Sequence, residues 1–192
     1  MKKSQLGRWL ICCVAFFLFG CSSTSSPPDY TSQQMDFSAV RSVAVLPLLN
    51  LSSDDQAGER VRDAFMGMLL ATEAIYVLPP GEVARGIKLA GMRMPQTPSV
   101  EEIIKLKTLL QVDAVITGVL REYGSVRSGS AEANLISLSL QMNETQTGSI
   151  VWSASSTKGG ISMSDRMLGS GGQPMNDVTM QVINDLLDQL FE

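Results

Sequence analysis

The chain has 192 residues, a formal net charge of −4 and a charged fraction of 18%, below the ~25% typical of soluble domains. It contains no histidine, which excludes a Ser-His-Asp triad, a Cys-His pair and any zinc site with histidine ligands. Its three cysteines are too few for a disulfide-rich scaffold, and its length allows one ordinary domain with tails.

The first twenty residues are typical of an export signal. Lys2, Lys3 and Arg8 precede an uncharged apolar run at 9–19. This run is too short for the ~20 residues of a membrane-spanning helix, but it suits the core of a signal peptide. We therefore predict a signal peptide at residues 1–20.

The end of this run resembles the bacterial lipobox, in which a leucine, two small residues and a cysteine direct lipidation and cleavage before the cysteine. Leu18, Gly20 and Cys21 match the pattern, whereas Phe19 stands where a small residue is preferred. The resemblance implies that Cys21 carries lipid and anchors the protein to a membrane, because several acyl chains give firm attachment.

A serine- and proline-rich stretch follows the cysteine and is expected to be a flexible tether over residues 21–37. Ser22, rather than aspartate, comes directly after Cys21. In enteric-type sorting this resembles an outer-membrane address with the domain facing the periplasm. The inner membrane and the cell surface stay open as alternatives.

Processing changes the chemistry of the chain. Cys12 and Cys13 leave with the signal, and lipid consumes the sulfur of Cys21, so no free thiol or disulfide remains. Three positive charges also leave, and the net charge falls from −4 to −7. An acidic chain with a single mature tryptophan, Trp152, is a poor match for a phosphate backbone. We therefore exclude nucleic acid as a partner.

The domain begins with a strand, a helix and a second strand. Residues 43–46 form an apolar run typical of a strand buried on both faces. Ser53 and Gln56 fit a capping box, and apolar residues at helical spacing carry this helix to about Thr72. A short strand follows at 75–78. This order predicts a parallel pair with a right-handed crossover.

The later elements predict an antiparallel meander and a terminal helix. We expect, in chain order, a weak helix at 81–90, a helix capped by Ser99 and Glu102, an apolar strand at 114–120, an alternating strand at 136–143, its partner from Ile150, and an amphipathic helix reaching Leu190. The predicted fold is a single α/β sandwich domain at residues 38–192, with a mixed sheet of about five strands, βαβ-like in its first half.

Three short motifs have some of the features of chemical sites. Ser155 and Lys158 have the S-x-x-K spacing of serine acyl-enzymes, but in a strand they face opposite ways and the companion motifs are missing. The glycines at 169–172 lack the lysine of a phosphate loop. Acidic residues at 54–59 lack the spacing of a calcium loop and suit a helix N-terminus. We predict no enzyme activity, no cofactor and no metal.

Three longer stretches together resemble a known group of bacterial envelope proteins. They are VAVLPLLNLSSDD at 43–55, DAVITG at 113–118 and ETQTGSIVWS at 144–153. The group includes relatives of the TolB amino-terminal domain, the curli-secretion lipoprotein and the lipoprotein activators of penicillin-binding proteins. Residues 74–79 and 121–124 add a similarity to a lipoprotein family that contains a meningococcal surface antigen.

This resemblance implies an α/β sandwich with an envelope interaction role and carries over no catalytic residues. It implies that Asn50 lies in the turn after the first strand and that Gly148 gives the hairpin its positive φ. Trp152 is expected in the core.

We therefore predict a lipid-anchored domain that binds an unidentified envelope protein, as an assembly or accessory factor. The alternative is a homo-oligomeric secretion channel like the curli exporter.

The segment from Lys158 to Asn176 is a further candidate for docking. It combines several glycines with Met163, Met167 and Leu168. Methionines in a connection of this length suit an adaptable interaction surface. The alternative is that residues 164–168 form one helical turn packed on the domain.

Overall fold

The computed structural model describes residues 29–32, 39–129, 131–161 and 172–191. The predicted lipidation site, Cys21, lies outside these residues, as do the predicted docking residues Met163, Met167 and Leu168. In the described part, no helix is long and apolar enough to cross a membrane.

A mixed sheet of seven strands runs through the described part of the chain, in the order β1-β7-β6-β5-β2-β4, with β3 beside β5. The strands are β1 (Tyr30–Thr31), β2 (Ser42–Val45), β3 (Leu49–Asn50), β4 (Tyr76–Val77), β5 (Ala114–Ser128), β6 (Ala131–Glu144) and β7 (Ile150–Gly159). β2 is parallel to β4 and β5, whereas β5, β6 and β7 are antiparallel. The expected parallel pair and meander are confirmed.

The expected count of five strands is wrong, because β1 and β3 were missed. Each has only two residues, and so short a strand shows no alternation of polar and apolar side chains. β1 also lies within the segment expected to be tether, and it pairs antiparallel with β7.

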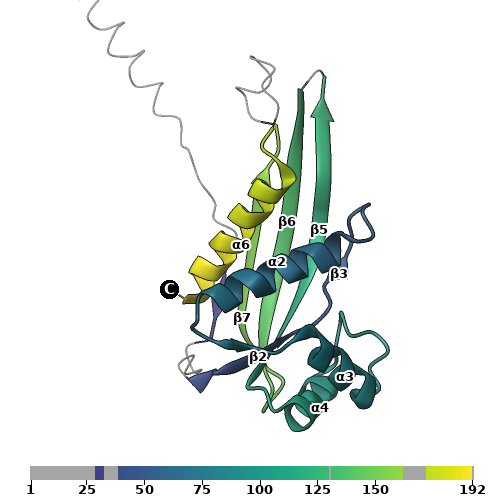
Figure 1. Cartoon of the computed structure of the whole chain (residues 1–192), viewed down its shortest axis with the longest axis vertical. Helices are drawn as coiled ribbons and strands as arrows, with labels where there is room; N and C mark the ends of the chain where they lie inside the picture. The colour runs from purple at the N-terminus through teal and green to yellow at the C-terminus, as the bar shows by residue number, and fades with distance from the viewer. Residues whose placement is uncertain (1–28, 33–38, 130, 162–171, 192) are drawn as a thin grey trace, which may run out of the picture.

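The longest strands, β5 and β6, form a hairpin that projects beyond the helices (Figure 1). Both extend past the apolar segments that predicted them, and the register shifts between Leu120 and Glu122. Near the tip, Arg127 donates to Glu132 over 2.6 Å. This hydrogen bond is the main cause that lowers the pKa of the Glu132 carboxyl. Cross-strand backbone pairing and this polar contact therefore help to hold the outer half of the hairpin.

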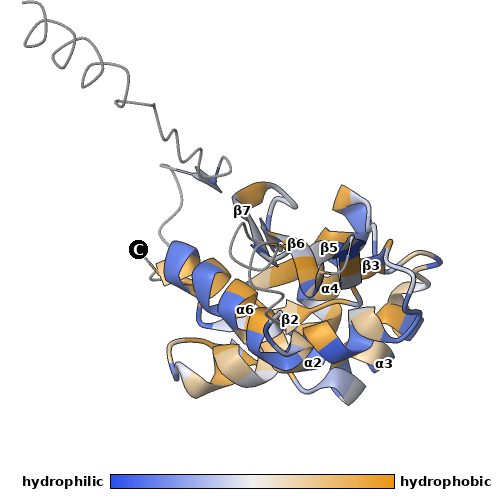
Figure 2. Ribbon diagram, turned by 90° about the horizontal axis from the view of Figure 1, so that it is seen from above, coloured by the Kyte–Doolittle hydropathy of each residue, from blue (hydrophilic) through white to orange (hydrophobic). Residues whose placement is uncertain are grey.

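Four helices in the described residues cover the sheet from two sides (Figure 1). α2 (Ala57–Ala71) and α6 (Met175–Phe191) lie on one face, where their apolar stripes pack on β5, β6 and β7. α3 (Pro80–Ala90) and α4 (Val100–Leu110) form a smaller second core with β2 and the start of β5. Figure 2 shows α6 with alternating orange and blue segments, as expected of an amphipathic helix with one buried side.

One of the two predicted helix caps is confirmed. Ser99 accepts from the Glu102 N–H, and the Glu102 side chain accepts from the Ser99 N–H. The cap at Ser53 is wrong, because α2 begins only at Ala57. The Asn50 side chain binds the backbone of Ser52 and Asp54, which holds a turn where the helix was expected to begin.

The hairpin roles implied by the resemblance agree with the structure. Gly148 has φ +73°. Trp152 is 1% exposed, and its indole N–H donates to the Gln189 carbonyl of α6 over 3.2 Å. Asn50, expected in the turn after the first strand, is the last residue of β3 and holds the turn that follows.

A buried arginine completes the hydrogen bonding of β2. On its β4 side, Val43 accepts from the Leu78 N–H. The next N–H along this parallel ladder would come from residue 80, which is Pro80 and has none. Instead, Nε and Nη2 of Arg62 donate to the Val45 carbonyl over 3.1 and 2.8 Å. Arg62 is 6% exposed and therefore acts as a structural group.

Candidate functional site

The helices of the described residues leave much of the outer face of β5, β6 and β7 open, because α3 and α4 pack on β2 and the start of β5. Its side chains alternate with those buried under α2 and α6. Most of them are polar: Thr117, Arg121, Ser137, Ser139, Gln141, Asn143, Ser153, Ser155 and Thr157. This face is therefore built to contact water or another molecule rather than a core.

Hydroxyl groups link the three strands across this face. Ser139 and Ser155 hydrogen bond over 2.9 Å, and Thr157 donates to Ser137 over 2.9 Å. At the end of the row, Nε of Arg121 donates to Ser139 over 3.4 Å. These cross-strand bonds fix the positions of the polar side chains.

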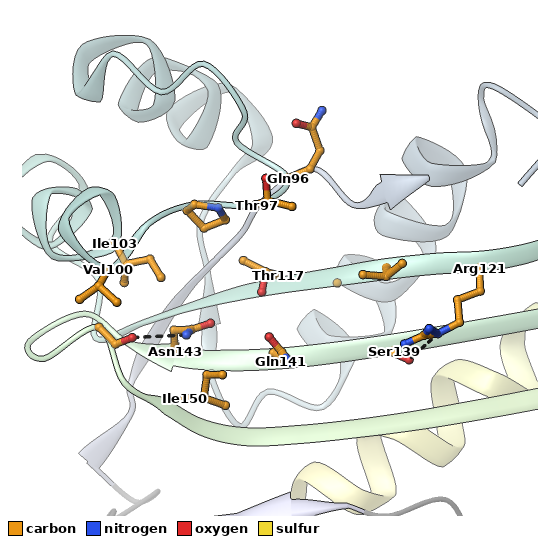
Figure 3. Close-up of a pocket in the computed structure, with 14 residues that line it drawn as sticks. Gln96, Thr97, Val100, Ile103, Thr117, Arg121, Ser139, Gln141, Asn143 and Ile150 are labelled. Atoms are coloured by element: carbon orange, nitrogen blue, oxygen red, sulfur yellow. Dashed lines mark hydrogen bonds between the residues drawn. The ribbon is translucent and has the colours of Figure 1, made fainter. Parts of the chain in front are cut away.

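A groove of about 400 Å³ lies where this face meets the loop before α4. Thr117, Gln141 and Asn143 form part of its floor. Gln96 and Thr97 stand on one side, Val100 lies near the turn between β6 and β7, and Ile150 lies at the β7 side (Figure 3). Pro98 also lines the groove. We call this feature the sheet-face groove.

The turn between β6 and β7 fixes the end of the sheet-face groove. The hydroxyl of Thr145 is fully buried and lies 2.6 Å from the Val112 carbonyl and 2.9 Å from that of Asp113. A Cβ on Gly148 would lie 2.6 Å from Cγ1 of Val100, so only glycine allows the turn to pack this closely on α4.

Hydrogen bonds to the Asp113 side chain join two strands of the sheet. The carboxylate of Asp113 accepts from the N–H groups of Arg41 and Ser42, each over 3.0 Å, and from the Ser42 hydroxyl over 2.9 Å. It joins the start of β5 to the start of β2. These hydrogen bonds give the Asp113 carboxylate a structural role.

The sheet-face groove combines unpaired polar groups with an apolar rim. The side chains of Gln96, Thr117 and Gln141 have no hydrogen bond to another described residue, so they can donate or accept. Val100 and Ile150 are 49% and 43% exposed at its edge. Such a mixture of apolar contact and fixed hydrogen-bonding groups is typical of a binding surface.

The charge of the sheet-face groove comes from one cation. Arg121 lines it, and no carboxylate does. In the described residues Arg121 makes no ion pair. The groove therefore favours a partner with an acidic group at this end.

The two side chains of the S-x-x-K motif, Ser155 and Lys158, do not lie together in the structure. Ser155 bonds to Ser139 on the open face, whereas Lys158 pairs with Asp185 of α6 on the other face. The two side chains of the S-x-x-K motif thus point away from each other.

The acidic cluster is also structural. Asp54 pairs with Arg60 and Glu59 with Arg62. Within the described residues, no group of three or more metal-binding side chains comes together.

The sequence match is decisive for the family. A family model described as "Putative lipoprotein GNA1162-like" matches residues 28–192, which is nearly all of the chain after the predicted signal. The chain belongs to the GNA1162-like lipoprotein family. A comparison with curated proteins finds no match.

Solved structures show the same fold in other bacterial proteins. Lipoprotein GNA1162 from Neisseria meningitidis is 22% identical, with a TM-score of 0.52, covering 79% of this chain and 98% of that one. A PelC dodecamer from Paraburkholderia phytofirmans is 14% identical, with a TM-score of 0.55 over 84% and 96%. The hypothetical protein CT253 from Chlamydia trachomatis is 12% identical, with a TM-score of 0.54 over 79% and 96%.

The sheet-face groove is not predictable from the sequence, although one signal for it is visible there. The alternation at 136–143 predicts a half-buried strand, and three of its polar positions, Ser139, Gln141 and Asn143, line the groove. The sequence carries no signal that the loop at 96–98 and Ile150 lie beside these residues.

Proposed function

We propose that this member of the GNA1162-like family is a lipid-anchored periplasmic domain that binds another envelope protein through the sheet-face groove. It would serve as an assembly or accessory factor for an envelope machine. The proposal rests on one observation above all: a polar sheet face, left open by the helices of the described residues, carries a groove with an apolar rim.

The anchor is proposed from the sequence and from the family. The lipobox resemblance assigns the lipid to Cys21, and membership of a lipoprotein family supports it. We further propose residues 1–20 as the signal, 21–37 as the tether and 38–192 as the domain. Ser22 supports an outer-membrane location facing the periplasm.

The anchor is tested by labelling cells with a lipid precursor. Label on the wild-type chain and its loss in Cys21→Ala are expected. Label that persists in Cys21→Ala would overturn the anchor, whatever the fate of the groove.

The groove is tested by chemical cross-linking in intact cells, followed by purification and mass spectrometry. Gln141→Arg places a bulky cation on the groove floor, and the same protein should then no longer co-purify. Gln181→Arg on the exposed side of α6 is the matched control and should retain it. Equal recovery with both variants would contradict binding through the groove.

The binding role also predicts that the protein performs no catalysis. The one nucleophile–base spacing in the sequence is split between the two faces of β7. Hydrolysis of a substrate panel by the purified chain, abolished by Ser155→Ala, would contradict this prediction.

A homo-oligomeric secretion channel is the second candidate, and the fold shared with a PelC dodecamer favours it. Electron microscopy of detergent-extracted protein separates the two. Rings of many copies would favour the channel, and small species would favour the accessory factor.

A further inference from the structure

β7 is an edge strand that its own chain covers only in part. β1 pairs with it at Trp152 and Ser153, and the Ser32 N–H donates to the Val151 carbonyl over 2.8 Å. In the described part of the chain, no backbone group pairs with this edge beyond Ser153. A strand edge with free N–H and C=O groups is a template for another strand.

The register shows which groups of β7 face outward. The carbonyl of Val151 faces outward and accepts from β1's neighbour Ser32. The N–H of Gly160 faces inward and donates to the Asn134 carbonyl of β6 over 2.8 Å. Because backbone groups alternate along a strand, those of Ser155, Thr157 and Gly159 also point outward.

The sequence and the backbone limit this free edge at its two ends. Extending the register of β1 toward the N-terminus would set residue 28 opposite Ser155. That residue is Pro28, which has no N–H to donate to the Ser155 carbonyl. At the other end, Gly159 and Gly160 both have φ +87° and end the strand. The open edge is therefore residues 155–159.

We infer that the open edge of β7 pairs antiparallel with the same edge of a second copy of this chain. A two-fold axis beside Thr157 would set Thr157 opposite its own copy and Ser155 opposite Gly159. The paired segment of the second copy then stops before Ser153, where β1 pairs with β7, so it does not displace β1. The length and limits of the edge thus match a second copy of itself.

The charges beside the edge are complementary in this arrangement. Lys158 would lie opposite Ser156 of the second copy, whose hydroxyl donates to Asp185 over 2.9 Å within its own chain. Lys158 itself pairs with Asp185. The two-fold axis therefore brings each lysine toward the aspartate of the other copy. A lysine on an edge usually discourages pairing, but here an adjacent carboxylate matches its charge.

Cysteine trapping in membranes tests the inference on the full chain. Directly opposed residues with outward backbone groups have Cα atoms about 5.5 Å apart, within disulfide range. Thr157→Cys should therefore give a dimer band on a non-reducing gel. In Ser155→Cys, the two cysteines would be four residues apart along the edge, roughly 14 Å, and no band is expected. The unmodified chain controls for its own cysteines.

A third variant tests the backbone pairing itself. Ser155→Pro, combined with Thr157→Cys, removes one outward N–H while leaving the inward bonds to β6 in place, so loss of the cross-link is expected. Thermal melting confirms that each variant is folded. A folded Thr157→Cys chain that stays monomeric would overturn the inference, and so would equal cross-linking in Thr157→Cys and Ser155→Cys.

Discussion

Replacing Arg62 by methionine should destabilise the domain by removing the only described partner of a buried carbonyl. The guanidinium donates twice to the Val45 carbonyl, in place of an N–H that Pro80 lacks. Methionine keeps most of the apolar stem, so the change acts mainly on the hydrogen bonds.

The expected loss follows from the two groups that Arg62 contacts. An unsatisfied buried carbonyl costs about 1–3 kcal/mol. The ion pair with Glu59 adds ~0–1 kcal/mol, because the Glu59 side chain is 63% exposed. We expect a net loss of about 2 kcal/mol, which for a domain of this size lowers the melting temperature by about 4–8 °C.

Urea unfolding of the purified chain from residue 22 onward measures this loss, with the fluorescence of Trp152, its single tryptophan, as the probe. Trp152 is buried against α6 and should report global unfolding. Arg60→Met is the matched control, since Arg60 forms a surface pair with Asp54 and lies 5.7 Å from the Tyr123 ring centroid. If Arg62→Met were no more destabilising than Arg60→Met, the account of the β2 ladder would be refuted.

Three further changes test other parts of the structure. Thr145→Val should cost about 1–3 kcal/mol of unfolding free energy, because it removes a buried hydroxyl that reaches the two carbonyls just before β5. Gly148→Ala should cost at least ~1 kcal/mol, since φ is +73° and the new Cβ would meet Val100. An NMR titration should give Glu132 a lower pKa in the wild type than in Arg127→Ala.

Each of these three predictions has a control substitution or an expected direction of change against which it can be checked. Gly124→Ala should be mild, because a Cβ there meets nothing within 4 Å. Thr147→Val should cost less than Thr145→Val, since Thr147 lies exposed in the same turn. The folded-state pKa of Glu132 is lowered, so its contact with Arg127 contributes above the unfolded pKa and is lost as the pH falls through the folded pKa. Equal pKa values in both chains would show that the contact does not form in solution.

Much of the fold was predictable because its core elements carry strong periodic signals. The alternation at 136–143 and the apolar runs at 43–46 and 114–120 identified β6, β2 and β5. The outer half of the β5–β6 hairpin was not predictable, because residues 121–128 are largely polar and are ordered by cross-strand pairing. Local side-chain patterns do not record such non-local contacts.

The candidate site was less predictable than the fold, since it forms where distant segments meet. Gln96 and Gln141 are unremarkable polar residues in sequence, and tertiary packing, including that of Gly148 on Val100, brings their segments together. The predicted cap at Ser53 is wrong for a different, local reason. Asn50 captures the backbone of the following turn and delays the helix to Ala57.

The most direct test of the proposed role is a photoactivated cross-linker placed on the floor of the sheet-face groove in living cells. The probe replaces Gln141, and a matched probe replaces Gln181 on the exposed side of α6. The account predicts one adduct with a specific envelope protein from position 141, lost when Arg121→Glu reverses the charge of the groove, and absent from position 181. Adducts that are the same at both positions, or that survive Arg121→Glu unchanged, would contradict binding through this groove.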